Sequence, residues 1–543
     1  MVSFDCQSCF FSALLFFFLT LFLFAFFSKK PKNELPPSPP SLPVIGYLHL
    51  FVLIIFGENF PQKIFTKEVY QKILRQVFYK KIFSLNFLFL FASIHKSFQK
   101  ISSTYGRFLH IRILNLRIVL VSSASVIYEI FKAQDINVSY RGDVAIDECM
   151  MLGLFGFIRA PCGDYLKFMK KIMMTKMIGP QALERSRGVR ELELERFYKN
   201  LLDKAIEKQS VDIGEEAIRL VTYTLGKMSM GSVFSQDNNE AVSKLCVEFG
   251  ALSPEFFIAQ VFHKMLQKVG ISVLKRNIMD VSNRFDELLE KILVKYEEQQ
   301  LDVHQGNEFM DALLAASRDE DAEYKITRKH IKGLFTELFF GAGDTSSTTT
   351  QWAMAEIINN PNILERLREE IDSVVGKERL IQETDLPKLP YLQAVINESL
   401  RLHPVGPVLP REFQQGCTVG GFYIAEGTIL VMNAYDVMRD PDYWEDPNTF
   451  KPERFLASSR SWQEEKRREH ALKFLSFGAG RRRCMGSNLG YTLVGTAIGV
   501  MVQHFDWEIK GDEVNMEEAS GLRFFLGLAH PLKCTPLPRI INH

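Results

Sequence analysis

At 543 residues, the chain is long enough to bury a large hydrophobic core, and its 65 basic and 64 acidic residues leave a formal charge of +1. This balance gives no electrostatic support for nucleic acid as a partner. Eight cysteines are scattered along the chain without the spacing of a disulfide framework. Such sparse usage is typical of a reducing compartment and argues against a small disulfide-rich secreted protein.

The first predicted element is a transmembrane anchor over residues 10–27, after a short stretch at 1–9. Its 18 residues carry no charge and are mostly Phe and Leu, and a helix of that length spans about 27 Å. Lys29, Lys30 and Lys32 follow directly, which places residues 1–9 in the lumen and the remaining chain in the cytosol. A cleaved signal peptide is the weaker alternative, because the basic residues lie on the wrong side of the apolar run.

Two segments separate this anchor from the main body of the chain. Residues 28–50 form a basic and Pro-rich hinge, whose prolines favour a stiff spacer between bilayer and globule, with an SH3-type ligand as the alternative. Residues 51–92 differ in character: they are rich in Phe, Ile, Lys and Leu, and neither helical nor alternating periodicity persists through them. This segment reads as an atypical insertion.

Residues 93–543 form the predicted catalytic body, which is mainly helical with short strand-like runs such as 118–121. The longest predicted helix runs from Arg328 to Asn359, about 32 residues. Small residues at its middle, from Gly341, allow a bulky ligand to lie against the helix, and the polar residues that follow can relay protons. In isolation, a close contact between helices with a Ser/Thr-rich end would be the default interpretation of such a run.

Residues 477–486 place one cysteine, Cys484, in a glycine-rich and strongly basic loop ahead of an apolar helical pattern at 489–502. The thiolate is the form of cysteine that binds metal, and cations, backbone N–H groups and a helix N-terminus stabilise it. Arg482 can donate hydrogen bonds to a carboxylate on the ligand. The alternative is a structural cysteine in a basic surface loop. We favour a metal-binding Cys484.

Five positions of this loop, Phe477, Gly480, Arg482, Cys484 and Gly486, resemble the haem-binding loop of the cytochrome P450 family, F-x-x-G-x-R-x-C-x-G. The resemblance implies the cytochrome P450 fold, mainly α with small β-sheets. It also implies a haem b cofactor whose iron is bound axially by the cysteine.

The middle of the long helix resembles a second family element, A/G-G-x-D/E-T-T/S, with Ala342 standing where the family usually has Gly. The resemblance implies that Asp344 and Thr345 deliver the protons that oxygen activation requires. Both residues are retained here. The extra methyl of Ala342 predicts an altered fit in the oxygen pocket more than lost chemistry.

Glu398, Arg401 and Arg454 resemble the family's E-x-x-R and P-E-R-F elements. The first two lie three residues apart on a predicted helix at 391–402 and therefore share one face. The resemblance implies that one carboxylate and two guanidiniums lock the core behind the cysteine loop. Without the resemblance, Glu398 and Arg401 would be interpreted as an ordinary surface ion pair that stabilises the protein by about a few tenths of a kcal/mol.

The resemblance also implies donors for the haem propionates, namely Lys170, Arg411 and Arg482. Lys170 belongs to a stretch that matches the family's W-x-x-x-R/K element, except that Leu166 replaces Trp. An indole donor is therefore missing, which predicts weaker haem binding or a changed reduction potential, and Tyr165 is a partial substitute.

Two segments carry clusters of basic residues that bear on how electrons are delivered to the protein. These residues are Lys167, Lys170, Lys171, Lys176, Lys473, Arg481 and Arg483. They are either ordinary solvated surface or, if the segments share a face, a cationic platform for an acidic electron donor. No flavin or nicotinamide motif occurs in the chain, so NADPH-cytochrome P450 reductase is the implied partner. By analogy, the substrate pocket is lined by residues 141–161, 338–340, 405–409 and 524–526, which are mostly apolar.

Residues 93–543 resemble plant A-type microsomal cytochromes P450. The runs at 122–126, 179–188 and 515–519 are similar to a subfamily of the mustard family, some members of which tailor triterpenes. The implied function is a haem-thiolate monooxygenase that inserts one atom of O2 into a small lipophilic secondary metabolite, triterpenoid or flavonoid-like. The implied location is the endoplasmic reticulum membrane, as a single-pass protein with a cytosolic catalytic domain.

Two alternative functions stay open, a non-oxygenating haem-thiolate isomerase or lyase and an inactive membrane-bound remnant. The remnant would be disabled by Leu166 and by the insertion at 51–92. In related plant sequences the hinge passes almost directly to a His-Lys-Ser stretch like that at 95–97. The insertion is therefore either a translated intron or a second, amphipathic element that contacts the membrane.

Overall fold

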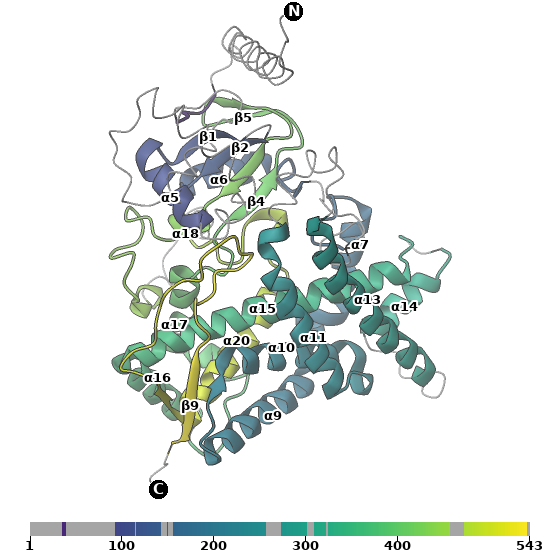
Figure 1. The fold of residues 1–543 in the computed structure, drawn as a ribbon, viewed down its shortest axis with the longest axis vertical. Helices are drawn as coiled ribbons and strands as arrows, with labels where there is room; N and C mark the ends of the chain where they lie inside the picture. The colour runs from purple at the N-terminus through teal and green to yellow at the C-terminus, as the bar shows by residue number, and fades with distance from the viewer. Residues whose placement is uncertain are drawn as a thin grey trace, which may run out of the picture. The chain divides into compact units, whose positions relative to one another are not determined.

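The computed structural model describes residues 35–39, 93–113, 116–142, 149, 156–256, 273–300, 309–321, 324–456 and 472–539. The chain divides into one unit of Met1–Val138 with Pro410–Asn433 and another of Ser139–Leu409 with Ala434–His543 (Figure 1). The predicted anchor at 10–27 and the insertion at 51–92 lie outside the described residues. Within the described parts of the chain, no helix combines the length and apolar character needed to cross a bilayer.

A four-stranded sheet, in the order β1-β2-β7-β4, belongs chiefly to the first unit. Its strands are β1 (Phe108–Ile113), β2 (Leu116–Val121), β4 (Leu409–Glu412) and β7 (Ile429–Met432). β1 and β2 pair antiparallel, whereas β2 and β7 pair in parallel with Ile118 opposite Ile429. The strand-like run at 118–121 is confirmed as the buried part of β2.

Two helices and a hairpin accompany this sheet: α5 (Ile94–Tyr105), α6 (Ala124–Gln134), β5 (Cys417–Val419) and β6 (Phe422–Ile424). Gly420 and Gly421 join the hairpin strands with φ of 56° and 82°. A two-residue turn of this kind needs positive φ at both positions so that its twist matches that of the strands. Glycine adopts such angles without steric cost, so the Gly-Gly pair sets the hairpin.

The second unit is mainly helical, as the sequence predicts. Its α-helices are α7 (Asp164–Met173), α8 (Pro180–Arg185), α9 (Arg187–Ile206), α10 (Ile213–Met230), α11 (Gln236–Ala251), α13 (Val273–Gln300), α14 (Phe309–Arg318), α15 (Arg328–Asn359), α16 (Pro361–Val374), α17 (Pro390–Leu402), α18 (Ala434–Val437) and α20 (Ser487–His504). A π-helix at Met174–Ile178 extends α7, and short 3-10 helices cover Gly231–Val233, Leu386–Lys388, Pro452–Phe455 and Gly480–Arg482. Strands β3 (Val211–Asp212), β9 (Lys533–Pro538) and β8 (Phe505–Ile509) form an antiparallel sheet in that order.

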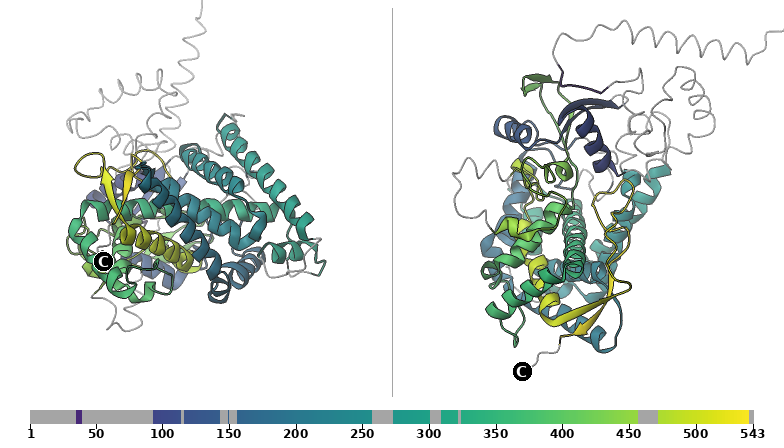
Figure 2. Two further views of the ribbon diagram at one scale, coloured as in Figure 1. Left: turned by 90° about the horizontal axis from the view of Figure 1, so that it is seen from below. Right: turned by 90° about the vertical axis from the view of Figure 1, so that its left-hand side faces the viewer.

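Helix α15 has the bounds that the sequence predicts and is buried along most of its length. Thr327 caps its start, with its N–H bonded to His330 Nδ1 at 3.1 Å. Pro361 begins the next helix and disfavours helical geometry at Asn360, which ends α15. Figures 1 and 2 show α10 and α11 alongside α15, and α17 and α20 also pack against it.

Two hydrophobic clusters meet on α15. Its first half contributes Phe335 and Phe339 to a cluster shared with α10, α11, α13 and α14. Its second half contributes Ala353 and Ile357 to a cluster shared with α9, α16, α17 and α20. The small and polar residues between them are therefore held in place by packing at both ends of the helix.

Candidate haem site

Cys484 lies in a tight loop ahead of α20. Its N–H donates to the carbonyl of Phe477 at 2.9 Å, and the N–H of Gly478 donates to the carbonyl of Leu475 at 2.8 Å. Gly478 and Gly480 have φ of 70° and 63°, which side chains other than glycine rarely adopt. The two glycines are therefore required by the backbone, which turns around the sulfur.

Opposing effects act on the pKa of the Cys484 thiol. Solvent reaches this side chain, yet enough protein surrounds it for desolvation to raise the pKa of the thiol. The N–H of Gly486 and the charges of Arg141 and Arg483 act in the opposite direction, as the sequence predicts, but they do not outweigh desolvation. Iron bound to this sulfur would supply the remaining stabilisation, because a coordinating thiol is deprotonated outright.

Cationic side chains gather near this loop. Arg482 Nε donates to the carbonyl of Ser139 at 2.7 Å, and Lys170 Nζ donates to the carbonyl of Arg481 at 2.7 Å. Burial lowers the pKa of Arg482, of Lys170 and of Arg141, the last to about 10. Partly desolvated positive charges of this kind are stabilised by nearby anions, and haem carries two carboxylates.

Arg141 was not identified from the sequence as a haem contact. Its Nε is buried without a hydrogen-bond acceptor among the described residues. Arg159 lies beside it, donating to the carbonyls of Arg141 and Gly142 at 3.2 Å each. Glu337 of α15 is a nearby carboxylate and accepts the N–H of Phe157 at 2.7 Å. Within this described group the cations exceed the carboxylates, so the site fits a dianionic, flat ligand such as haem.

Glu398 on α17 joins the other predicted structural residues in one buried cluster. It accepts Arg401 Nε at 2.7 Å and Arg454 Nε at 3.0 Å. The side chains of Glu398 and Arg401 are both 0% exposed. Ser476 Oγ donates to the carbonyl of Leu400 at 3.0 Å, which ties α17 to the segment that enters the cysteine loop. The charge cluster thus supports the loop through α17.

Asp344 and Thr345 occupy the middle of α15. Thr345 Oγ1 donates to the carbonyl of Gly341 at 2.6 Å, one turn earlier. Burial raises the pKa of Asp344 to about 6, although the charge of Arg523 opposes the shift. Asp344 Oδ2 points toward α11, 3.5 Å from where a Cβ would lie on Gly250. A carboxyl with this pKa can both take up and release a proton near neutral pH.

Gly343, which follows the motif position now occupied by Ala342, has a packing role. Gly343 is buried against α10, where an added Cβ would lie 3.0 Å from Thr222 Cγ2 and 3.2 Å from Ile218 Cγ1. An alanine there would force the two helices apart. The shifted glycine therefore sets the close approach of α10 and α15.

Ala342 is the residue at which α15 departs from the motif. It is partly buried and packs against the first hydrophobic cluster, as do Met485, Phe524 and Phe525. These residues come from α15, from the loop next to Cys484 and from the segment before β9. All three segments therefore pack against the same hydrophobic cluster.

The remaining predicted residues are placed as follows. Phe477 packs its ring against Tyr491 of α20 at 5.4 Å. Leu166 is buried on α7, whereas Tyr165 directs its ring to His330 at the start of α15, with centroids 5.2 Å apart. Arg411 lies on β4 in the first unit, is buried and donates to the carbonyl of its neighbour Pro410 at 2.7 Å. The roles of Tyr165 and Arg411 toward haem stay predictions.

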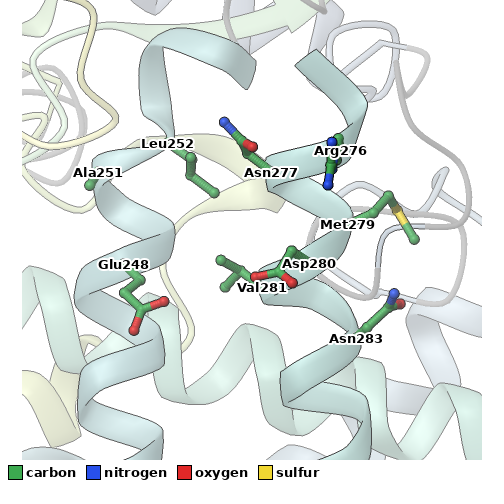
Figure 3. A pocket seen from close by; sticks show the side chains of 9 residues that line it. All are labelled: Glu248, Ala251, Leu252, Arg276, Asn277, Met279, Asp280, Val281 and Asn283. Atoms are coloured by element: carbon green, nitrogen blue, oxygen red, sulfur yellow. The ribbon is translucent and has the colours of Figure 1, made fainter. Parts of the chain in front are cut away.

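A separate hollow of about 650 Å³ lies between α11 and α13 (Figure 3). Glu248 and Leu252 line it from one side, and Asn277 and Asp280 from the other. Arg284 pairs with both Glu248 and Asp280, so two carboxylates that line the hollow are already in ion pairs. None of the residues predicted to contact haem lines this hollow.

Comparison with known proteins identifies the family. Residues 77–532 match the sequence profile of the family described as Cytochrome P450. Over 537 residues the chain is 55% identical to cytochrome P450 705A1 of Arabidopsis thaliana, covering 98% of this chain and 96% of that protein. Over 533 residues it is 33% identical to 3,9-dihydroxypterocarpan 6A-monooxygenase of Glycine max, covering 96% of each.

The fold is likewise that of solved structures. A zebra fish cytochrome P450 with abiraterone matches with a TM-score of 0.67 at 23% identity, over 82% of this chain and 99% of that one. The chain therefore belongs to the cytochrome P450 family and is a haem-thiolate monooxygenase, whose iron is bound by a cysteine.

Proposed function

We propose that this monooxygenase inserts one oxygen atom from O2 into a lipophilic plant secondary metabolite of triterpenoid or flavonoid type. The observation that carries the proposal is an aromatic group on α15. The ring of Phe340 contacts those of Phe249 at 4.7 Å, Phe525 at 5.4 Å and Phe524 at 6.1 Å. As walls of the predicted substrate pocket, these rings would favour flat, apolar molecules with few polar groups. One relative carries 3,9-dihydroxypterocarpan in its name, in line with this class.

The residues of the site take the following roles. Cys484 would bind the haem iron, since its loop turns around an accessible sulfur. Arg482 and Lys170 would bind the propionates, and the buried guanidinium of Arg141 would join them. Bound haem supplies the chemistry that activates O2. The fit of haem to this site rests on the buried cationic side chains described above.

Protons reach the oxygen side through α15. The carboxyl of Asp344, with a pKa of about 6, takes up and releases a proton near neutral pH. Thr345 holds its hydroxyl on the carbonyl of Gly341. Rotation of that hydroxyl toward the pocket lets it donate a hydrogen bond to an oxygen atom there. Thr345 thus orients the proton that Asp344 exchanges.

Electrons come from NADPH-cytochrome P450 reductase. The bond from Lys170 Nζ to the carbonyl of Arg481 joins α7 to the cysteine loop. The exposed side chains of Lys167, Arg481 and Arg483 therefore lie on neighbouring segments. A cationic surface of this kind suits an acidic donor. We place the pair on the endoplasmic reticulum membrane, where residues 10–27 anchor this chain.

The test is a substrate screen with the full-length chain in microsomes that contain the reductase. Triterpene alcohols and flavonoids are supplied with NADPH and O2, and products with one added oxygen are sought by mass spectrometry. A product that needs both NADPH and O2 supports the proposal. Conversion without NADPH indicates an isomerase or lyase. Absence of the red-shifted Soret band in the reduced protein with CO indicates an inactive remnant.

A further inference from the structure

Trp352, in the second half of α15, is tied to a segment far away in the chain. Its side chain is 0% exposed, and its indole Nε1 donates to the carbonyl of Leu526 at 2.8 Å. A buried indole N–H needs such an acceptor. Leu526 closes the apolar run 524–526, one of the segments predicted to line the substrate pocket. A single side chain of α15 therefore holds this run directly.

The same run is joined to a second predicted pocket wall. The N–H of Leu526 donates to the carbonyl of Val405 at 2.9 Å. Val405 begins the segment 405–409, which also lines the predicted pocket. Both polar groups of the Leu526 backbone are thus used, one toward α15 and one toward the segment 405–409. A shift of Leu526 would move both walls.

His403 fixes the second wall from another direction. Its ring stacks on that of Trp352, with centroids 3.9 Å apart and planes within 2°. Its Nε2 lies 2.7 Å from Glu356 Oε1. Burial lowers the pKa of His403, so the neutral ring donates its Nε2–H to the carboxylate. Glu356 is one turn beyond Trp352 on the same face of α15. His403 is thus held by two residues of α15, two positions before Val405.

The apolar run is also held at its other end. The rings of Phe524 and Phe525 pack against Phe340, three turns before Trp352 on α15. The run therefore lies along α15 between an aromatic contact and a hydrogen bond. Aromatic packing tolerates small displacements, whereas a buried hydrogen bond is directional. Trp352 is the contact that sets the position of the run.

We propose that Trp352 and His403, supported by Glu356, are positioning residues that hold the segments 405–409 and 524–526 against α15 and thereby determine how a ligand is oriented over the haem iron. The inference rests on the proposed function for the identity of the pocket walls. It assigns substrate orientation to residues that lie behind those walls and do not touch the substrate.

The test compares Trp352→Phe with Trp507→Phe in the full-length, haem-loaded protein. Both variants keep an aromatic ring and lose one indole bond to a backbone carbonyl, because Trp507 Nε1 donates to Met501 at 3.1 Å, away from the pocket walls. Imidazole and phenylimidazole are titrated by absorbance. Both bind iron through nitrogen, but only phenylimidazole is large enough to report on the walls. The ratio of the two Kd values is the readout.

We expect Trp352→Phe to change this ratio by about threefold to tenfold, the equivalent of one lost hydrogen bond. In Trp507→Phe it should change by less than about twofold. The reduced protein with CO should give the same red-shifted band in both. An unchanged ratio in haem-loaded Trp352→Phe overturns the inference and leaves the proposed function standing. No such band in the unmutated protein overturns both.

A second variant keeps the inference testable if Trp352→Phe does not hold haem. His403→Gln removes the stacked ring but retains an amide N–H for Glu356. A changed ratio in this variant supports positioning by the stacked pair. An unchanged ratio, or loss of haem here as well while Trp507→Phe retains it, shows that the pair serves general stability and overturns the inference.

Discussion

The cysteine side of the haem site and its α15 side differ in what holds their residues in place. Behind the cysteine loop, Glu398 binds two guanidiniums, and the side chains of Glu398 and Arg401 are fully removed from solvent. On the other side, the ring of Phe340 on α15 packs against that of Phe524 in a group of aromatic side chains. Charged hydrogen bonds are directional and demand particular partners, whereas packing accepts other residues of similar volume. The cysteine loop accordingly matches its family motif at every fixed position, whereas α15 departs from its motif at Ala342.

The largest effect is expected at the sulfur. Cys484→Ala should abolish the red-shifted CO band, because no thiolate then binds the iron. Cys162→Ala is the matched control: it removes another exposed cysteine near Lys170 and Arg482 and should leave the band intact. Absorbance of the reduced protein with CO measures both. A normal band in Cys484→Ala would show that another residue binds the iron.

The charge cluster should come next. Glu398→Ala leaves Arg401 and Arg454 without their carboxylate in a buried site, which should cost about 3–5 kcal/mol and prevent haem from being held. Glu453→Ala removes an exposed carboxylate paired with Arg366 at 2.7 Å, and should cost less than about 1 kcal/mol. Denaturant unfolding and the haem content of the purified proteins check both. Equal costs would show that burial of the Glu398 cluster adds nothing to its contribution to stability.

On the α15 side, Asp344 links activity to stability. Burial raises its pKa from 3.8 to about 6. As the pH rises, Asp344 therefore loses its proton at a higher pH in the folded protein than in the unfolded chain. The contribution of this carboxyl to stability is therefore greatest below pH 3.8 and is lost as the pH rises to about 6. Asp344→Asn removes this penalty and should stabilise the protein by about 3 kcal/mol at pH 7.5 and by about half of that at pH 5.

The same variant should lower substrate turnover by about a hundredfold or more, because a neutral amide cannot exchange protons. Denaturant unfolding at the two pH values measures the first effect, and product formation per NADPH measures the second. Equal stability gains at both pH values would mean that the carboxyl does not titrate in this range. Normal turnover would remove Asp344 from the proton path.

The smallest effects separate two glycines of α15. Gly343→Ala places a methyl against α10 at Thr222 and Ile218, and should destabilise the protein by about 1–3 kcal/mol. Gly341→Ala meets no atom within 4 Å, and should gain up to about 1 kcal/mol from helix propensity. Thermal unfolding distinguishes the two. If both substitutions stabilise the protein, α10 does not approach α15 as closely as described.

Features that depend on neighbouring residues were predicted well from the sequence. The bounds of α15 are correct because a capping residue and a proline mark its ends. The helix predicted at 391–402 begins one residue earlier, at Pro390, and the pattern at 489–502 extends to Ser487–His504. The cysteine loop could be recognised because its glycines and its cysteine lie within ten residues.

Features that depend on distant segments could not be predicted. Arg141 and Cys484 interact only because the fold brings them together, and no spacing in the sequence indicates it. The same holds for the indole of Trp352 and the carbonyl of Leu526. An apolar pattern indicates that a residue is buried, but not which partner it has. A buried Trp beside a His-Pro pair is a signal only once the packing is known.

The charge cluster behind the cysteine loop has a consequence for biosynthesis. Glu398 and Arg401 leave the ribosome well before Arg454, and the cysteine loop follows later still. Until Arg454 emerges, burying the Glu398–Arg401 pair would leave Glu398 without one of its hydrogen-bond donors. This part of the nascent chain therefore gains little from early compaction. The charge cluster and the cysteine loop that it supports are therefore completed only near the end of translation. Haem insertion is expected to follow synthesis of the whole catalytic body.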